Sequence, residues 1–383
     1  MKALLIINSL GAGGAEQSLV EFLSACSHDL RPVVACFTRT VEGVQDAAIR
    51  EGVDVRFVPS RRLGGRVRAI RRLIEDTQPD LIHTTIFEAD VVGRLAAAGT
   101  RVPVLTSLVS TPYDPVRLED PAVAAWKLRM VKVIDGWTAR RLTTHFHAIT
   151  ETVKREAIRH LRITPTDVTV IERGRDPERL GEPSSDRRAR ARATLDLSGD
   201  EFVLLSVGRQ EFQKGQSYLL EAMPALIERV PETRALIAGR RGNASMRLEA
   251  TSRQMNLNGR ARFLGHRSDV PDLLAAADLF VFPSLYEGLG GALIEAMALG
   301  LPIVASDLSA IREVVEDGAN AVLVPVGSPS DLVEAIASLA TDPNRRRRMG
   351  ERSRQIFLER FTLERSARRM AELFERVAAG RRR

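Results

Sequence analysis

The order of apolar segments constrains the fold of this chain more than any other feature of its sequence. From residue 2 onward, short apolar runs typical of β-strands alternate with segments in which apolar residues recur at helical spacing. The first-half runs are ALLII, PVVACF, VRFV, LIHT, VPVLTS and HFHAIT. The second-half runs are EFVLLSVG, RALIAG, ARFLG, LFVFPS, LPIVAS and NAVLVP. This alternation predicts an α/β protein with two doubly wound, Rossmann-like domains.

A division into two domains also fits the length of 383 residues. The segment RGRDPERLGEPSSDRRARARA has no strand pattern before Glu201 and is rich in Arg, Pro, Gly and Ser. We therefore predict an N-terminal domain over residues 1–184 and a C-terminal domain over 185–361, with a cleft between them. Apolar residues at helical spacing from Thr362 onward predict a terminal amphipathic helix over 362–383.

Composition limits the cellular setting. The two cysteines, Cys26 and Cys36, cannot form a disulfide framework or a four-thiolate metal site, which favours a reducing cytoplasm. Charged residues interrupt every apolar run before about 18 residues, so any membrane contact is expected to be peripheral. We therefore expect a cytoplasmic protein, either free or bound to the inner face of the plasma membrane.

Basic residues exceed acidic ones by 56 − 49 = 7, which favours anionic partners. A nucleic-acid-binding protein is one alternative, but three Tyr and two Trp offer few stacking surfaces. In residues 61–74, Leu63, Val67, Ile70 and Ile74 form a stripe surrounded by arginines. That pattern is typical of a helix lying on an anionic membrane surface, and equally of a surface helix that packs its stripe on its own sheet.

The first strand runs into the glycine-rich turn NSLGAGGAEQ, which is expected to open a helix near Ala15. Backbone amides in such a turn can approach a phosphate or a sugar. A dinucleotide fingerprint is disfavoured, because Glu16 stands where G-x-G-x-x-G needs its third glycine. A plain tight turn and a binding loop both remain open.

In the second half, SVGRQEFQKGQSY places Gly208 and Arg209 at the end of a strand, and Lys214 at the start of a helix. Two cations at the carboxyl end of a strand, beside a helix N-terminus, are well placed for a diphosphate. Taken alone, both could equally be surface charges. The sequence of a P-loop, G-x-x-x-x-G-K-[ST], does not occur.

The stretch PSLYEGLGGALIEAMALGLPIVAS carries two glutamates eight positions apart. Glu287 is expected in a glycine-rich loop, and Glu295 about one turn into a helix over Ala292 to Leu299. A carboxylate at Glu295 can accept hydrogen bonds from the two adjacent hydroxyls of a ribose. Pairing of Glu295 with a buried arginine is the alternative.

Together these motifs resemble family 4 of the retaining glycosyltransferases, which have the GT-B fold. The resemblance covers nearly the whole chain. It rests on GGAE at 13–16, VGRQEFQKG at 207–215, FLGHRSDVPDLLAAADLFVFPS at 263–284, and the E-x7-E pair followed by AMALGLPIVAS. RFTLERSARRMAELF at 360–374 resembles the terminal helix that crosses back to the N-domain in that fold.

The resemblance implies a role for each site residue. Arg209, Lys214 and Glu287 are expected to be catalytic, the two cations holding the donor diphosphate and Glu287 the hydroxyls of the transferred sugar. Glu295 is expected on the ribose, and Leu264 to Arg267 near the base. The expected donor-binding residues are Gly13, Gly14, Gly208, Leu264, Gly265, His266, Arg267, Leu289, Gly290, Gly291 and Glu295.

The implied reaction is retaining transfer of a hexose from a nucleotide sugar to a glycan, lipid-linked or small-molecule acceptor, in cell-envelope or polysaccharide biosynthesis. UDP is the expected nucleotide, with GDP and ADP as alternatives. No D-x-D occurs in the chain, so neither a metal nor another cofactor is expected. A sugar-nucleotide epimerase or hydrolase of similar architecture is the alternative enzyme, which product analysis with donor alone would identify.

Two departures from the family pattern leave the acceptor side open. Val109 stands near the position where members often carry a sugar-contacting histidine. Arg173-Gly174-Arg175-Asp176 replaces the common N-G-x-D.

Overall fold

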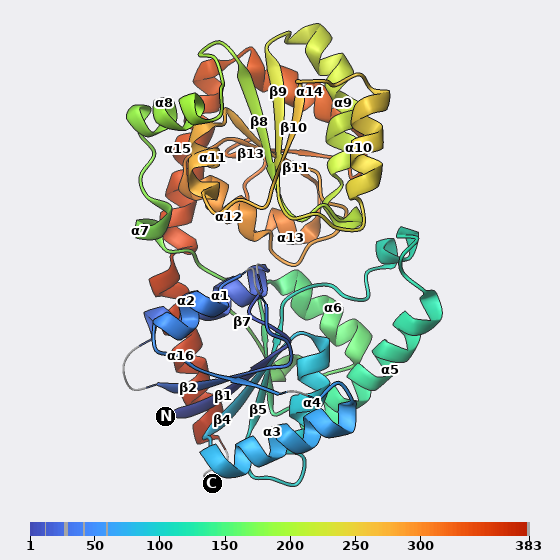
Figure 1. Ribbon diagram of the computed structural model, residues 1–383, viewed down its shortest axis with the longest axis vertical. Coiled ribbons are helices and arrows are strands. Elements are labelled where there is room, and N and C mark those ends of the chain that lie inside the picture. Colours follow the sequence, from blue (N-terminus) through green and yellow to red (C-terminus); the bar gives the residue numbers. More distant parts are fainter. Residues whose placement is uncertain (12, 27–29, 41–42, 59, 381–383) are drawn as a thin grey trace. The chain divides into compact units, whose positions relative to one another are not determined.

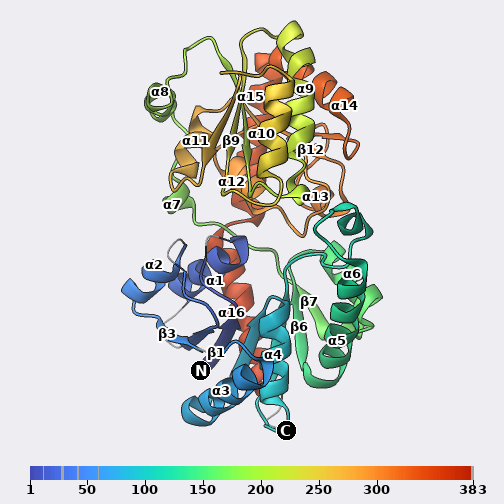
Figure 2. The same cartoon turned by 45° about the vertical axis from the view of Figure 1, so that its right-hand side comes forward.

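A computed structural model describes residues 1–11, 13–26, 30–40, 43–58 and 60–380. It contains two compact units. The first comprises Met1–Tyr113, Val123–Arg175 and Thr362–Arg383, and the second comprises Asp114–Ala122 and Asp176–Phe361. Each unit is described by itself (Figures 1 and 2).

Within the described residues, the first unit contains a seven-stranded parallel sheet with the order β3-β2-β1-β4-β5-β6-β7. Its strands are β1 Lys2–Ile7, β2 Arg31–Cys36, β3 Asp54–Phe57, β4 Leu81–Thr85, β5 Val104–Leu108, β6 His145–Ala148 and β7 Val168–Val170. All but β7 follow apolar runs that the sequence identifies. β7 has three residues, which is too short for a periodic pattern to show.

Helices cover both faces of this sheet (Figure 1). They are α1 Gly14–Ala25, α2 Gln45–Arg50, α3 Leu63–Thr77, α4 Phe87–Ala97, α5 Ala125–Leu142, α6 Glu151–Leu161 and α16 Leu363–Ala379, with a short 3₁₀ turn at Pro165–Asp167. Leu5 and Ile7 of β1 pack with α1 and α16, whereas Leu4 and Ile6 pack with α3 and α4. Because alternate residues of a strand face opposite sides, the run ALLII contributes to both cores.

Helix α3 contains the arginine-rich segment for which a membrane contact was one interpretation. Ile70 and Ile74 are buried, and Val67 packs against the same core cluster as α4. Arg71 donates to the carbonyl of Ala98 at 2.6 Å, so it also serves the fold. The unit's own core thus covers most of the stripe, as the alternative interpretation expects, and a membrane contact through residues 61–74 stays a prediction.

The second unit contains, in its described residues, a six-stranded parallel sheet with the order β10-β9-β8-β11-β12-β13. Its strands are β8 Phe202–Val207, β9 Thr233–Ala238, β10 Ala261–Gly265, β11 Leu279–Phe282, β12 Ile303–Ser306 and β13 Ala321–Val324. Its helices are α7 Pro177–Leu180, α8 Ser185–Thr194, α9 Gln216–Arg229, α10 Ser245–Gln254, α11 Val270–Ala276, α12 Gly291–Ala298, α13 Ser309–Arg312, α14 Pro329–Ala340 and α15 Pro343–Arg360, with 3₁₀ turns at Pro115–Glu119 and Phe212–Lys214.

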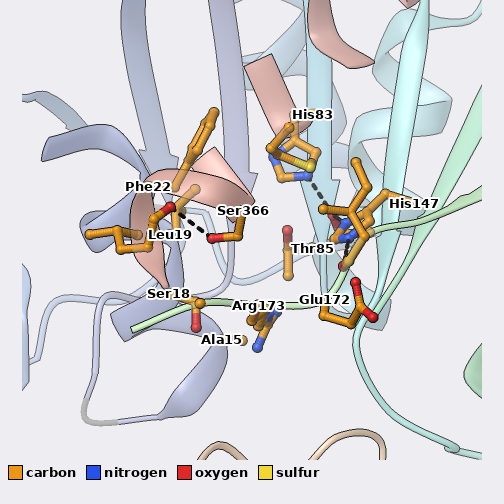
Figure 3. A pocket seen from close by; sticks show the side chains of 15 residues that line it. Ala15, Ser18, Leu19, Phe22, His83, Thr85, His147, Glu172, Arg173 and Ser366 are labelled. Atoms are coloured by element: carbon orange, nitrogen blue, oxygen red, sulfur yellow. Dashed lines mark hydrogen bonds between the residues drawn. The ribbon is translucent and has the colours of Figure 1, made fainter. Parts of the chain in front are cut away.

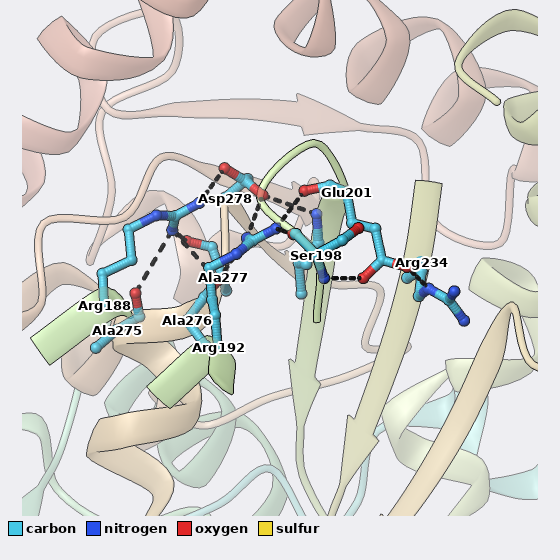
Figure 4. Close-up of polar contacts among 10 residues, drawn as sticks. Arg188, Arg192, Ser198, Glu201, Arg234, Ala275, Ala276, Ala277 and Asp278 are labelled. Atoms are coloured by element: carbon cyan, nitrogen blue, oxygen red, sulfur yellow. Dashed lines mark hydrogen bonds and ion pairs between the residues drawn. The ribbon is translucent and has the colours of Figure 1, made fainter. Parts of the chain in front are cut away.

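Helix α8 shows that the arginine-rich segment before Glu201 is structural. Arg188 donates to the carbonyl of Ala277 at 2.6 Å and to Asp278 at 2.7 Å (Figure 4). Arg192 donates to the carbonyl of Glu201 at 2.7 Å. The carboxylate of Asp278 also accepts from the amide of Val203 at 2.8 Å. These arginines fasten α8 to the beginnings of β8 and β11.

Both sheets reverse their order at one point, between β1 and β4 in the first unit and between β8 and β11 in the second. In open parallel sheets, ligands bind outside the carboxyl ends of the strands at such switch points. The residues that follow these four strands are therefore the first candidates for a functional site.

Candidate active site

The glycine that follows β8 makes room for a lysine. The carbonyl of Gly208 accepts from the side-chain amide of Gln216 at 3.2 Å, which ties the strand end to α9. A Cβ atom on Gly208 would lie 3.3 Å from the Cδ atom of Lys214. A larger residue at this position would therefore displace the lysine side chain.

Lys214, which is partly buried, forms an ion pair with buried Glu287, although 73 residues separate them in sequence. Ser284 donates its hydroxyl to the same carboxylate oxygen of Glu287 at 3.0 Å. The ammonium group also lies 5.4 Å from the centroid of the Phe282 ring. The structure thus brings together two predicted site residues, and their charges neutralise each other.

Arg209 is held much more loosely. Half of its side chain is exposed, and its guanidinium lies 3.6 Å from the carboxylate of Glu211. Exposed ion pairs contribute little free energy, so the guanidinium can turn toward an anion at small cost.

The loop between β11 and α12 is fixed to the turn that carries Lys214. The amide of Leu285 donates to the carbonyl of Gln213 at 2.8 Å, and the side-chain amide of Gln213 donates to the carbonyl of Tyr286 at 2.9 Å. Gly215 has a φ of +57°, and a Cβ atom there would lie 2.0 Å from the carbonyl oxygen of Pro283. The two loops are therefore locked together.

Helix α12 begins at Gly291, after buried Leu289 and after Gly290 with a φ of +82°. The first amides of a helix have no intrahelical acceptor and carry the positive end of the helix dipole. Glu295 is partly exposed on the same side of α12 as Ala292, whereas Leu293, Ile294, Ala296 and Met297 are buried. The apolar run that surrounds Glu295 in the sequence is thus the opposite face of its helix.

The segment from Leu264 to Arg267 lies at the end of β10, two strands from β8. His266 is exposed, and the carbonyl of Gly265 accepts from the amide of Gly239 at 2.8 Å. Arg267 donates to both carboxylate oxygens of Asp269 at 2.7 and 2.5 Å. The guanidinium of Arg267 is therefore already engaged by Asp269. Arg267 also lines a pocket with residues of α8 and α11.

In the first unit, the motif GGAE forms the start of α1. Gly13 caps the helix, and a Cβ atom on it would lie 2.2 Å from a carboxylate oxygen of Glu16. Glycine at position 13 therefore allows Glu16 to fold back over the helix N-terminus. Gly14 has open space beside it, and its carbonyl accepts from Arg173 at 3.2 Å.

Sequence reasoning missed the polar residues at the switch point of the first sheet. The side chain of Asn8 accepts from the amide of Ala89 at 3.1 Å and donates to Glu88 at 3.4 Å. Arg66 forms an ion pair with Glu88. Ile86, directly after β4, has a φ of +79°, which is strained for a β-branched residue. These residues could have been identified from the sequence, because Asn8 and Glu88 lie shortly after the ends of predicted strands.

A pocket in the first unit contains a directed chain of hydrogen bonds (Figure 3). His147 Nε2 donates to the carbonyl of Ile171 at 2.8 Å, so its Nδ1 accepts from the Ser107 hydroxyl at 2.8 Å. The Ser107 oxygen in turn accepts from His83 Nε2 at 2.7 Å. Burial lowers the pKa of His83 to about 3 and that of His147 to about 4, so both rings are neutral.

Two family descriptions match most of the chain. Glycosyl transferases group 1 matches residues 187–356, and Glycosyltransferase Family 4 matches residues 12–179. D-inositol 3-phosphate glycosyltransferase 2 of Catenulispora acidiphila is 31% identical over 371 residues, covering 89% of this chain and 84% of that protein. The chain belongs to the family 4 glycosyltransferases.

Another relative of this glycosyltransferase is the UDP-Gal:alpha-D-GlcNAc-diphosphoundecaprenol alpha-1,3-galactosyltransferase of Escherichia coli. It is 28% identical over 280 residues, which cover 72% of this chain and 70% of that protein. The enzyme therefore transfers a sugar from a nucleotide-sugar donor, as the sequence motifs predict.

Solved structures establish the GT-B fold of the glycosyltransferase. Anabaena HepE, in complex with UDP and glucose, has a TM-score of 0.87 at 23% identity and covers 98% of this chain and 100% of its own. WaaG, a glycosyltransferase involved in lipopolysaccharide biosynthesis, has a TM-score of 0.78 at 16% identity, covering 97% and 99%. The predicted fold is confirmed, including a terminal helix, α16, that belongs to the first unit.

Two further findings concern the described residues of this glycosyltransferase. No helix among them combines the length and the apolar character needed to cross a bilayer. No group of three His, Cys, Asp or Glu side chains in the same ranges is arranged to hold a metal ion.

Proposed function

We propose that the donor is a UDP-sugar and that residues 185–361 bind it at the carboxyl ends of β8 and β11. The largely buried ion pair of Lys214 and Glu287 supports this proposal. A lone buried charge is costly, so each partner stabilises the other until the donor arrives. When the donor binds, its diphosphate replaces Glu287 as the partner of the Lys214 ammonium group, and hydroxyls of the sugar donate hydrogen bonds to Glu287. Glu295 accepts from the ribose, and the segment 264–267 lies near the base.

The proposed chemistry needs stabilisation of a departing diphosphate. Negative charge grows on that group as the glycosidic bond breaks, so fixed cations bind the transition state more tightly than the ground state. Lys214 is held in place by its contacts with Glu287 and Phe282, and Arg209 can turn toward the same group. The amides of Leu289, Gly290 and Gly291 add donors at the start of α12. We propose that transfer needs no metal and retains the anomeric configuration.

We further propose that the acceptor is a lipid-linked saccharide on the cytoplasmic side of the membrane and that the first unit binds it. The lipid-linked acceptor in the name of the E. coli relative supports this choice. Asn8 and Glu88 supply an amide and a carboxylate at the switch point of the first sheet, where a hydroxyl group can be oriented. The strained backbone of Ile86 beside them supports a functional site there.

The donor is tested by a thermal-shift screen against UDP-, GDP- and ADP-sugars, repeated with EDTA. We expect stabilisation by UDP-sugars and the same shift when EDTA is present, because binding to the folded state raises its stability. A larger shift with GDP- or ADP-sugars would contradict the UDP assignment. Loss of the shift with EDTA would contradict metal independence. Incubation with the donor alone should leave it intact, whereas free sugar or an epimerised donor would point to a hydrolase or an epimerase.

A further inference from the structure

The outer face of α5 carries an unusual concentration of exposed apolar side chains. Exposed fractions range from 40% at Ile134 to 71% at Val133, and the face also includes Trp126, Met130 and Trp137. These are five of the eleven large exposed apolar side chains in the described residues, and the other six are scattered over other segments. A contiguous exposed apolar stripe of this kind marks a contact surface.

The five residues form one stripe because their spacing is four, three, one and three residues. The opposite face of α5 is buried and anchored. Arg94 of α4 forms an ion pair with Asp135 at 2.7 Å, and Tyr113 donates to the same carboxylate at 2.7 Å. This anchoring holds the apolar stripe outward.

Basic residues border the stripe on both sides. Lys127 and Arg141 lie along one edge, and Arg129 and Arg140 lie along the other, all four exposed. The acidic residue of α5, Asp135, is on the buried face and is paired with Arg94. The exposed face of the helix is therefore apolar in the middle and positive at its margins.

We propose that the outer face of α5, defined by Trp126, Met130, Val133, Ile134 and Trp137, docks the enzyme on an anionic lipid surface. Helices that lie in a membrane interface combine an apolar face with flanking Lys and Arg and with Trp at headgroup level. The flanking cations add attraction to anionic headgroups. This surface deepens the proposed use of a lipid-linked acceptor, but docking requires neither donor nor acceptor.

The only two tryptophans of the chain lie on this face, so intrinsic fluorescence reports on it directly. Wild-type protein should bind phosphatidylglycerol-containing vesicles at low salt, with a blue shift of tryptophan emission and quenching by brominated lipid tails. Pure phosphatidylcholine vesicles should bind at least about tenfold more weakly, because the flanking cations find no anionic partner. Failure to bind anionic vesicles, or binding without a change in emission, would overturn the proposal.

A double variant, Met130→Glu with Val133→Glu, keeps both tryptophans and alters exposed positions. It should reduce vesicle binding by at least about tenfold, because it places two anions on the apolar stripe. Met246→Glu, at a more exposed position of α10 in the second unit, is the control and should bind as wild type does. Equal binding by the double variant and the wild type would contradict the proposal.

Two measurements distinguish lipid docking from dimer formation through the stripe and from a failure of the proposed function. If the stripe joined two copies of the chain, wild-type protein without vesicles would be a dimer that the double variant disperses, and the lipid proposal would fall. Transfer to a water-soluble acceptor should be unchanged in the double variant, because the altered residues do not touch the proposed site. Vesicle binding with no transfer to any acceptor would leave docking intact and instead refute the proposed function.

Discussion

The two sheets share one strand order around their switch points but place different chemistry there. In the second unit, the ends of β8 and β11 carry a lysine, an arginine and two glutamates on loops locked by glycines. In the first unit, the ends of β1 and β4 carry an amide, a carboxylate and a strained isoleucine, while His83 and His147 are buried and neutral. Strand order thus fixes where a ligand can bind, and the loops decide which ligand.

The largest expected effect is on turnover in the second unit. Arg209→Ala and Lys214→Ala should each lower turnover by roughly 100- to 1000-fold, since loss of one such contact typically costs about 3 to 4 kcal/mol of barrier. Donor affinity should fall less, and the double variant should be less than additive because both cations serve one group. Steady-state kinetics with a working acceptor measures both quantities.

Arg229→Ala is the matched control for these cation variants. Arg229 pairs with Glu334 on the exposed surface of α9, so its loss should leave turnover near wild type. Near-wild-type turnover in both Arg209→Ala and Lys214→Ala would remove the cations from the chemistry.

The next effect is acid sensitivity confined to the first unit. The folded pKa values of His83 and His147 lie below the usual 6.5, so below about pH 6.5 the unfolded state binds more protons than the folded state. The two rings therefore lose stability as pH falls from about 6.5 toward 4, by up to about 1.4 kcal/mol per pH unit for each ring. Burial raises the pKa of Asp90 in the same unit to about 6, which offsets part of this loss below pH 6. The second unit contains one histidine, exposed His266, and should not share this loss.

Denaturant titrations between pH 7 and pH 4.5 measure the difference between the units. His83→Gln keeps a donor for Ser107 but cannot titrate, so it should flatten the acid dependence even if stability at pH 7 falls. His266→Asn should change nothing. An identical pH slope in His83→Gln and the wild type would refute the assignment.

A smaller effect is expected on donor affinity. Glu295→Gln should weaken UDP binding by about tenfold, because hydrogen bonds from the ribose to a charged acceptor are lost while the helix is kept. Glu228→Gln, at an exposed position of α9, is the control. Calorimetric titration with UDP gives both affinities. Unchanged affinity in Glu295→Gln would favour a structural ion pair over contact with the ribose.

The smallest effect is expected at α3, the basic helix whose stripe faces its own sheet. Arg68→Glu with Arg72→Glu alters two exposed positions without touching the contacts of Arg66 or Arg71. Vesicle binding should change less than twofold, compared with the loss expected for α5. A loss as large as that of Met130→Glu with Val133→Glu would restore α3 as a membrane contact.

The strands were predictable because most are apolar runs of four to six residues buried on both faces. The pairing of Lys214 with Glu287 was not, because no local pattern links residues so far apart. The positive φ of Ile86 could not be predicted either, because isoleucine is not a residue type that indicates a left-handed backbone. The exposed apolar stripe of α5 was missed because the buried face of this helix carries Asp135, Gly136 and Thr138 instead of large apolar residues, so its sequence lacks the pattern that made α3 conspicuous.

Helix α16 has a consequence for how the protein is made. Its residues Ala367, Met370, Leu373 and Phe374 complete the core beneath β1, the first strand to leave the ribosome. The second unit draws all its strands from residues 202–324, so it can close while α16 is still being synthesised. During that interval part of one face of the first sheet lacks its helical cover, and nascent chains stalled before residue 363 should be the form that chaperones retain.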